Sequence, residues 1–465
     1  MFPTSVYVGR RDLLRRKLGR GLALFLGNGE SPMNYADNAH PFRQDSSFLY
    51  FFGLDAPGLA AVLDLDEGVA TVFGDDASID DIVWTGPQEL LADRAARAGV
   101  FTTAPLSGLA DALSRSRAAR RPIHFLPPYR ADNLARLHEL LGLPLDAVRA
   151  GASTELIDAV IALRAVKDAG EIAEIEKAAD VSVDMHVAAI SGARPGMIEG
   201  ELAAEVRRIA LASGGDIAFP IILSRDGQTL HNHGHGNRLS EGDLVVCDFG
   251  AETNLHYCAD LSSSFPVSAA FTERQREIYA VSLRAHEAAI SVLAPGVPFL
   301  KAHQAACRAM ALGLRELGLM RGDPDEAVAA GAHALFFPCG TGHMMGLDAH
   351  DMEDLGEDRV GYGGLPRSGQ FGLKSLRLVR PLEPGFVVTI EPGIYFIPEL
   401  IDRWRAEGRF SDFIAWERVE EYRAFGGLRN EEDFLITAGG ARRLGKPKPL
   451  SIAEIEALRP SVPRA

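Results

Sequence analysis

The sequence predicts an α+β protein in two parts, an N-terminal α/β domain over residues 1–152 and a larger α+β domain over residues 153–465. Three observations support this division. Short apolar runs alternate with helical patterns in the first third, long helical patterns follow, and short Gly-rich β segments lie between and after them. A chain of 465 residues is long enough to bury two sizeable cores.

The first domain is predicted from short apolar runs that end at turn residues. The run over 22–26 stops at Gly27, and the run over 123–126 stops at two prolines, which is typical of buried strands. Asp66-Glu67-Gly68 separates two further runs and indicates a β-hairpin. The aromatic run over 47–52 is short and stops at Gly53. In chain order, the predicted elements are a strand over 22–26, hairpin strands over 59–65 and 69–73, a helix over 90–98, a strand over 123–126 and a helix over 134–141.

The second domain begins with a long helical pattern over residues 154–190, which is interrupted near residues 167–170. Short Gly-rich β segments lie between and after the helical patterns that follow, which predicts helices interleaved with antiparallel strands. The boundary between the two domains is expected near residues 151–154. Three further helices are predicted over 199–213, 278–293 and 299–317.

Charge and hydropathy exclude several classes of partner. The chain has 48 Lys and Arg residues and 63 Asp and Glu residues, which gives a net charge of −15. Nucleic acids and anionic membranes both require a positive surface, so neither is expected as a partner. No apolar stretch approaches the roughly 18 residues that a membrane span needs. The first apolar run lacks a small-residue cleavage site after it, and we expect a cytoplasmic protein.

The cysteines also favour a cytoplasmic location. They form no CxxC pair and are too few for a disulfide framework, which favours a reducing environment. We expect them to be inert small apolar residues rather than metal ligands. The four are Cys247, Cys258, Cys307 and Cys339.

A short internal repeat suggests two related halves in the second domain. Residues 239–250 can be laid over residues 382–393 without a gap, and both read Leu-x-x-Gly-x-aliphatic-Val-x-x-acid-x-Gly. Each copy describes a turn, an apolar strand and a carboxylate beside a glycine. The repeat is short, so coincidence is the alternative. If the halves are related, each delivers one carboxylate, Asp248 or Glu391, to a shared centre.

These acidic residues stand where an unpaired carboxylate is costly, at the end of an apolar strand. A pairing with lysine or arginine would explain one such residue, but two in matched contexts favour a cation centre. Asp260 lies across a predicted turn from Asp248, so the two are expected to face each other, and acidic residues follow a glycine-rich segment at 431–433. His343 is flanked by glycines that allow close approach of a ligand. One imidazole with several carboxylates suits Mn²⁺, Co²⁺ or Zn²⁺.

Taken together, these motifs resemble the metal-dependent Xaa-Pro peptidases of the pita-bread fold, aminopeptidase P and prolidase. The resemblance covers both domains, because residues 42–53 resemble the N-terminal domain of aminopeptidase P. It implies a pita-bread catalytic domain with halves related by a pseudo-twofold axis. The motifs are Cys247-Asp-Phe-Gly-Ala-Glu252, Tyr257-Cys-Ala-Asp260, Gly342-His-Met-Met-Gly-Leu-Asp-Ala-His-Asp351, Thr389-Ile-Glu-Pro-Gly-Ile-Tyr395 and Phe425-Gly-Gly-Leu-Arg-Asn-Glu431.

The resemblance also implies a ligand set. It predicts two divalent metal ions per chain, usually Mn²⁺ with Co²⁺ or Zn²⁺ as alternatives, and a hydroxide between them. Four carboxylates at −1 each offset two +2 ions, so the centre is nearly neutral before the hydroxide is counted. The five implied ligands are Asp248, Asp260, His343, Glu391 and Glu431.

Further residues are implied to contact the substrate, a peptide with proline at the second position. His231 resembles the histidine that contacts the substrate carbonyl, and His350 the second histidine that donates a hydrogen bond to the developing charge. Glu391 is implied as the general base. Arg377 resembles the prolidase arginine that binds the free carboxylate of a dipeptide, with a surface cation as the alternative. Arg429 is expected to pair with an acid and so to brace the strand of Glu431.

The sequence departs from the family at two places. Leu261-Ser-Ser-Ser264 stands where the family commonly has Ile-Thr-Arg-Thr, so an arginine and two threonines beside the metal site are missing. Asn430 stands where an aliphatic residue usually packs. Neither departure removes an implied ligand.

The predicted function is an Xaa-Pro aminopeptidase, a cytoplasmic homodimer or homotetramer. The nearest alternative is an Xaa-Pro dipeptidase, which Arg377 favours and the N-terminal domain opposes. A metal-free relative such as creatinase is a second alternative, and a non-catalytic binding protein on the same fold is a third. Both would be expected to lose ligands, whereas all five are present.

Overall fold

The computed structural model describes residues 1–459, which divide into two compact units. Met1–Arg164 and Asp354–Gly356 form the first unit, and Ala165–Glu353 and the chain from Glu357 form the second. The predicted boundary after residue 152 therefore differs from this division by one helix. That helix, α8 (Thr154–Arg164), buries Leu156 and Val160 and packs on α1 (Thr4–Leu18) within the first unit.

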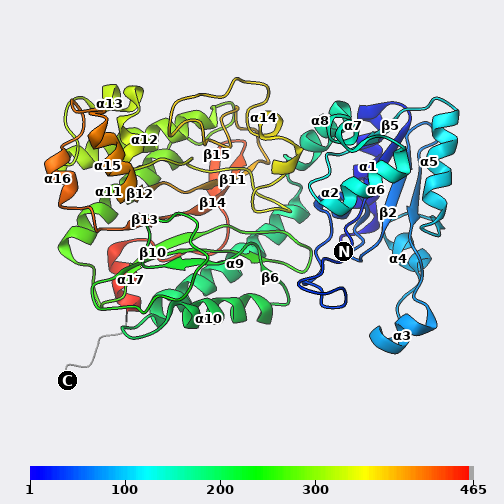
Figure 1. The fold of residues 1–465 in the computed structure, drawn as a ribbon, viewed down its shortest axis with the longest axis horizontal. Helices are drawn as coiled ribbons and strands as arrows, with labels where there is room; N and C mark the ends of the chain where they lie inside the picture. Colours follow the sequence, from blue (N-terminus) through cyan, green and yellow to red (C-terminus); the bar gives the residue numbers. More distant parts are fainter. Residues whose placement is uncertain (460–465) are drawn as a thin grey trace. The chain divides into compact units, whose positions relative to one another are not determined.

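The first unit, drawn mostly in blue to cyan in Figure 1, is built on a five-stranded mixed sheet in the order β4-β3-β2-β1-β5. Strands β1, β2 and β3 pair antiparallel, and the outer strands β4 and β5 pair parallel to their neighbours. The strands are β1 (Leu22–Leu26), β2 (Ala60–Asp64), β3 (Val69–Phe73), β4 (Thr102–Ala104) and β5 (Ile123–Phe125). The helices besides α1 and α8 are α2 (Ser46–Phe52), α3 (Ile79–Thr85), α4 (Leu91–Arg97), α5 (Gly108–Ala118), α6 (Ala131–Leu141) and α7 (Leu145–Ala150).

These elements match the predicted hairpin, strands and helices of this part of the chain. The aromatic run, which had no assignment, is helix α2, and its ends explain why. Asp45 caps the helix by accepting a hydrogen bond from Phe48 N, and Gly53 ends it with φ +64°. Apolar side chains of the sheet and of α5, α6 and α7 form the core, with Leu24, Leu113, Leu137 and Val148 among them.

The second unit contains four small sheets and most of the long helices. Its sheets are ordered β10-β8-β7, β11-β14-β15, β12-β13 and β6-β9. The strands are β6 (Asp216–Ile217), β7 (Ile222–Ser224), β8 (Leu244–Asp248), β9 (Ala251–Glu252), β10 (Ser262–Pro266), β11 (Val387–Ile390), β12 (Gly393–Tyr395), β13 (Gly427–Arg429), β14 (Glu432–Thr437) and β15 (Gly440–Arg443). The helices are α9 (Ala169–Gly192), α10 (Glu199–Ala212), α11 (Glu273–Ile290), α12 (Phe299–Glu316), α13 (Pro324–Ala330), α14 (Glu357–Val360), α15 (Pro398–Ala406), α16 (Trp416–Glu420), α17 (Ile452–Leu458) and the short 3₁₀ helix η1 (Ala332–Leu335). A second 3₁₀ helix, η2 (Glu353–Leu355), begins at the last residue of this part of the unit and continues into the Asp354–Gly356 segment of the first unit.

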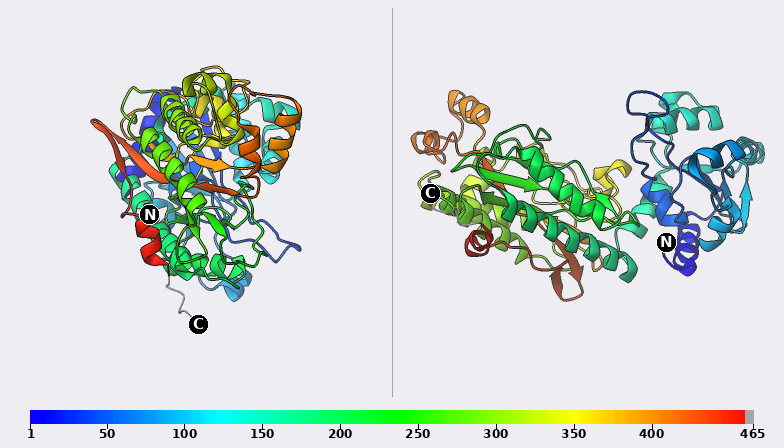
Figure 2. Two further views of the ribbon diagram at one scale, coloured as in Figure 1. Left: turned by 90° about the vertical axis from the view of Figure 1, so that its left-hand side faces the viewer. Right: turned by 90° about the horizontal axis from the view of Figure 1, so that it is seen from below.

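The long helices pack in two pairs around the strands. Helices α9 and α10 lie side by side, and so do α11 and α12 (Figures 1 and 2). Helix α9 contacts β9 and β10, and α11 contacts β11, β12 and β13. The helical pattern over 154–190 is two helices, because Asp168 caps α9 at the predicted interruption by accepting hydrogen bonds from Gly170 N and Glu171 N. Among residues 1–459, no helix is long and apolar enough to cross a membrane.

The internal repeat corresponds to matching backbone. Strands β8 and β11 occupy the same positions of the two copies, and each follows a turn glycine in the left-handed region. Gly242 has φ +87° and Gly385 has φ +92°. Only glycine adopts this conformation routinely, so both copies need glycine for the same reason.

In both halves, a backbone hydrogen bond joins the loop between the paired helices to the first residue of the repeat copy that follows. In the first half, Gly196 N donates to Leu239 O at 2.8 Å. In the second half, Gly296 N donates to Leu382 O, also at 2.8 Å. The two halves of the second unit therefore share a helix pair, a turn and a strand that ends in a carboxylate.

Candidate metal centre

The first half contributes two aspartates from paired strands. Asp248 is the last residue of β8, and Asp260 stands two residues before β10. Strands β8 and β10 run antiparallel with Ser262 opposite Asp248, which brings both aspartates to the same end of the pair. Both side chains are buried. The prediction that they face each other across a turn is confirmed.

The second half contributes two glutamates in the same manner. Glu391 directly follows β11, and Glu431 directly precedes β14. These strands run antiparallel with Ile390 opposite Glu432, so the two glutamates lie at one end of the pair. Glu431 is buried, whereas Glu391 is partly exposed.

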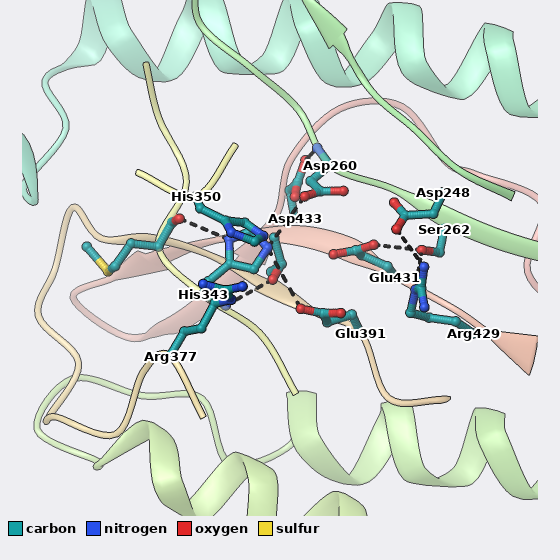
Figure 3. Close-up of polar contacts among 12 residues, drawn as sticks. Asp248, Asp260, Ser262, His343, His350, Arg377, Glu391, Arg429, Glu431 and Asp433 are labelled. Atoms are coloured by element: carbon teal, nitrogen blue, oxygen red, sulfur yellow. Dashed lines mark hydrogen bonds and ion pairs between the residues drawn. The ribbon is translucent and has the colours of Figure 1, made fainter. Parts of the chain in front are cut away.

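His343 comes from a loop and completes the cluster (Figure 3). Its backbone N donates to Thr389 Oγ1 at 3.1 Å, which fixes the loop on β11. Its Nδ1 donates to the carbonyl of Met344 at 3.0 Å, so Nε2 is left as the free acceptor. Nε2 lies 3.4 Å from Asp260 Oδ2 and 3.8 Å from Glu391 Oε1.

All five side chains that the sequence singled out therefore meet in one place. Three overlapping groups have ligand atoms within 4.8 Å of one another. A metal centre requires donor atoms that converge in this way. The groups are Asp248, Asp260 and Glu431; His343, Glu391 and Glu431; and Asp260, His343 and His350.

The raised carboxyl pKa values of the cluster and its oxygens without a hydrogen-bond donor indicate a cation site. Burial raises the pKa of Asp260, and the negative charges of Asp248 and Asp433 raise it further. Burial and the charge of Asp260 raise the pKa of Glu431, and burial also raises the pKa of Glu391. Asp248 Oδ1 and Asp260 Oδ1 accept no hydrogen bond from the described residues. Buried carboxylate oxygens without a donor fit divalent ions.

A buried arginine holds the other side of the cluster. Arg429 Nη2 donates to Asp248 Oδ2 at 2.5 Å, which confirms that this arginine pairs with an acid. Its Nε donates to Ser262 Oγ at 2.9 Å and its Nη1 to Tyr395 Oη at 2.8 Å. Ser262 Oγ in turn donates to Glu431 Oε2 at 2.7 Å. Arg429 and Ser262 thus orient one carboxylate from each half.

His350 lies at the edge of the cluster in a chain of charged groups. Its Nδ1 lies 2.7 Å from Glu353 Oε2, and this hydrogen bond lowers the pKa of Glu353 to about 2. A carboxylate only accepts, so Nδ1 carries the proton and Nε2 of the neutral ring is an acceptor. Burial and the neighbouring His343 lower the pKa of His350 to about 4. The expected hydrogen-bond donation by Nε2 therefore requires the protonated ring.

Arg377 belongs to the same chain of groups. It is one-third exposed, pairs with Glu353 and lies 2.8 Å from Glu357 Oε1. His231 follows β7 in a loop and is exposed. Partial burial and the charge of Arg429 lower the pKa of His231, and the charges of Asp248 and His350 also act on it. Both residues thus lie beside the cluster.

Sequence reasoning missed three residues that support the site. Ser262 departs from the family pattern, yet its hydroxyl joins Arg429 to Glu431. Glu353 had a local signal, because it stands three residues after His350. Lys448 had none. Its Nζ donates to Ser262 O at 2.5 Å from a distant part of the chain.

The polar residue at position 430 also has partners. Asn430 is fully buried, and its Oδ1 lies 3.1 Å from Tyr279 Oη. Its Nδ2 donates to Ser282 Oγ at 3.4 Å. Helix α11, which carries both partners, therefore accommodates an amide where an aliphatic residue was expected.

Comparison with known proteins agrees with this geometry. Residues 173–438 match the profile of Metallopeptidase family M24, and residues 7–124 match "Aminopeptidase P, N-terminal domain". The chain is 30% identical to the Xaa-Pro dipeptidase of Rattus norvegicus, over 98% of this chain and 93% of that protein. It is 29% identical to the Xaa-Pro aminopeptidase of Escherichia coli (strain K12), over 97% and 96% of the two chains.

Solved structures give the same result for the fold. The structure of aminopeptidase PepP from Pseudomonas aeruginosa matches with a TM-score of 0.80 and 28% identity, over 98% of each chain. A zinc-substituted aminopeptidase P of E. coli in complex with product matches with a TM-score of 0.79 and 27% identity, over 98% of each chain. The second unit has the pita-bread fold of these structures.

Proposed function

Because the chain belongs to metallopeptidase family M24, we propose that it is an Xaa-Pro aminopeptidase, which releases the N-terminal residue that precedes proline. The observation that carries this proposal is the convergence of four carboxylates and His343 in one cluster, in which Glu391 is partly exposed and the other four side chains are buried. Xaa-Pro aminopeptidases with the same two domains are among its relatives.

We assign the metal ligands to the five residues of this cluster. Asp248, Asp260 and Glu431 form one group of converging donors, and His343, Glu391 and Glu431 form another. Two groups that share a carboxylate suit two ions, and four negative charges balance two divalent cations. Oxygen-rich donors with one imidazole favour Mn²⁺ over softer metals. When bound, the ions activate water and polarise the scissile carbonyl.

The side chains around the ions carry the proton and orient the peptide. Glu391 lies at the open side of the cluster, and we assign it as the general base. It takes a proton from the attacking water and delivers it to the proline nitrogen as the C–N bond breaks. His231 donates to the substrate carbonyl. His350 accepts through Nε2 in its neutral form and donates only once protonated.

The test is the position of proline in a tetrapeptide. With Mn²⁺ present, the protein is expected to release alanine from Ala-Pro-Pro-Ala and to leave Ala-Ala-Pro-Ala intact. Chromatography of the products measures both reactions. Equal release of alanine from the two peptides would contradict the requirement for proline at the second position.

An Xaa-Pro dipeptidase is the second candidate, because similarly close relatives carry that name. The two functions differ in whether the peptide continues beyond proline. The kcat/KM for Ala-Pro is therefore compared with that for Ala-Pro-Pro-Ala under the same metal loading. The aminopeptidase proposal expects the longer peptide to be preferred, and a clear preference for Ala-Pro would replace it by the dipeptidase. The cytoplasmic location and the homodimer or homotetramer stay predictions.

A further inference from the structure

A second cluster of metal-binding side chains lies outside the carboxylate centre. His303 and Cys307 stand four residues apart on α12, which places them on one face of the helix. His333 comes from η1. All three are buried, and one donor atom from each lies within 4.8 Å of the others. The cluster contains no carboxylate and shares no residue with the five ligands assigned above.

His303 is oriented toward Cys307 by a hydrogen bond on its far side. Its Nδ1 lies 2.8 Å from Thr341 Oγ1, and its Nε2 lies 3.3 Å from Cys307 Sγ. Two donors of a tetrahedral zinc ion, each 2.0–2.3 Å from the metal, lie roughly 3.3–3.8 Å apart. The spacing of His303 and Cys307 already falls in this range. A partner on the other ring nitrogen is the usual support of a metal-ligating histidine.

His333 lacks the hydrogen bonds that a buried imidazole needs. It is 1% exposed, and neither Nδ1 nor Nε2 has a hydrogen-bond partner among the described residues. A buried polar group without a partner is destabilising, and such groups are rare in folded proteins. A metal ion between the three side chains would supply the missing partner for one of its nitrogens.

The two imidazoles are in the neutral state that metal binding requires, whereas the thiol must lose its proton. Burial lowers the pKa of His303 to about 3 and of His333 to about 4, so both rings are neutral at pH 7 and offer lone pairs. Burial raises the pKa of the Cys307 thiol. Binding therefore breaks the S–H bond, forms a sulfur–metal bond and releases one proton to solvent.

We propose that His303, Cys307 and His333 bind one zinc ion, separate from the carboxylate centre, with a non-protein ligand in the fourth tetrahedral position. Two imidazoles and a thiolate favour zinc over Mn²⁺, whereas the oxygen-rich centre favours Mn²⁺. The ion connects α12 to the segment before the His343 loop. Thr341, which holds His303, also accepts a hydrogen bond from Glu391 N at 2.7 Å. The expectation that all four cysteines are inert is revised for Cys307.

Cobalt substitution tests this site, because the carboxylate centre has no thiolate. Protein expressed in zinc-depleted, cobalt-supplemented medium is expected to show thiolate-to-cobalt charge-transfer absorption in the near ultraviolet. Cys307→Ser is expected to lose this band and to bind one cobalt equivalent less. No band in the wild-type protein, or a band that persists in Cys307→Ser, would overturn the proposal.

Two further variants keep the test decisive if Cys307→Ser does not fold. His333→Phe keeps the thiol and the side-chain volume, and it is expected to lose both the band and one cobalt equivalent. Cys258→Ser changes a buried thiol outside the cluster and is expected to retain both. A band that survives in His333→Phe, or that disappears in Cys258→Ser, would show that the thiolate and the histidine of this cluster do not hold the metal.

Discussion

Lys448 shows that a residue far away in the chain can lie beside the metal centre. The resemblance leads us to expect an arginine where Ser263 stands, and Lys448 Nζ donates to Ser263 Oγ at 3.2 Å. A second buried cation beside the metal centre, in addition to Arg429, thus comes from the C-terminal part of the chain. Burial lowers the pKa of Lys448 to about 8. A contact over 185 residues leaves no local pattern, so the sequence could not predict that Lys448 lies beside Ser263.

The first prediction at this scale separates a metal ligand from its neighbour. Asp260→Asn removes a charged ligand without removing volume, so metal binding and kcat/KM are expected to fall by roughly 100-fold or more while the fold is retained. Asp433→Asn is the matched control. Asp433 accepts a hydrogen bond from Asp260 N at 3.1 Å but belongs to no ligand group among residues 1–459. Elemental analysis and peptide hydrolysis measure both variants, and equal losses would refute the assignment of Asp260.

The second prediction concerns Arg377, whose two roles have different consequences. If Arg377 binds the carboxylate of a dipeptide, Arg377→Ala lowers kcat/KM for Ala-Pro by roughly 30- to 1000-fold, or about 2–4 kcal/mol, and hardly changes Ala-Pro-Pro-Ala. The alternative is that Arg377 acts only through Glu353, with which it pairs and which is hydrogen-bonded to His350. Equal losses on both peptides would mean that Arg377 only positions His350 through Glu353.

At the scale of elements, the strand ends that carry the ligands could be predicted because their pattern is local. An apolar run, a carboxylate and a glycine stand within a few residues in both halves. The helix over 46–52 could not be predicted in this way, because its cap residues decide it rather than its apolar pattern. The first unit ends later than predicted because the helix over 154–164 packs on α1. A local sequence pattern does not indicate which element a helix packs against.

The matched turn glycines give a prediction for the two halves. Both have positive φ, so an alanine at either position is expected to destabilise the protein by about 1–2 kcal/mol. A Cβ at Gly385 would also lie 2.7 Å from Val166 Cγ1, whereas a Cβ at Gly242 would meet nothing within 4 Å. The urea midpoint is therefore expected to fall more for Gly385→Ala than for Gly242→Ala. Equal midpoints would contradict the packing around Gly385.

At the scale of the whole molecule, the raised carboxyl pKa values make the metal-free protein sensitive to pH. Burial raises the pKa of Asp260 and Glu431 in the folded state above their unfolded values, which lie near 4. Each group then contributes stability that is fully present below pH 4 and is lost as the pH rises through the folded pKa. Bound cations reverse this trend, because they favour the ionised carboxylates.

This linkage can be measured as a difference between two proteins. Metal-free wild type is expected to lose stability relative to metal-free Asp260→Asn as the pH rises from 5 to 8, because the variant lacks one titrating carboxyl. Urea denaturation at several pH values gives the comparison, and all other titrating groups largely cancel in it. A constant difference over this range would show that the pKa of Asp260 is not raised in the folded protein.

The central claim is that ions held by the four carboxylates and His343 make this chain a peptidase. The most direct measurement is a titration of metal-stripped protein with Mn²⁺, in which bound metal and the initial rate of alanine release from Ala-Pro-Pro-Ala are followed together. We predict no cleavage without metal and a rate that reaches its plateau near two Mn²⁺ per chain. Full cleavage by protein that contains no metal would contradict the account.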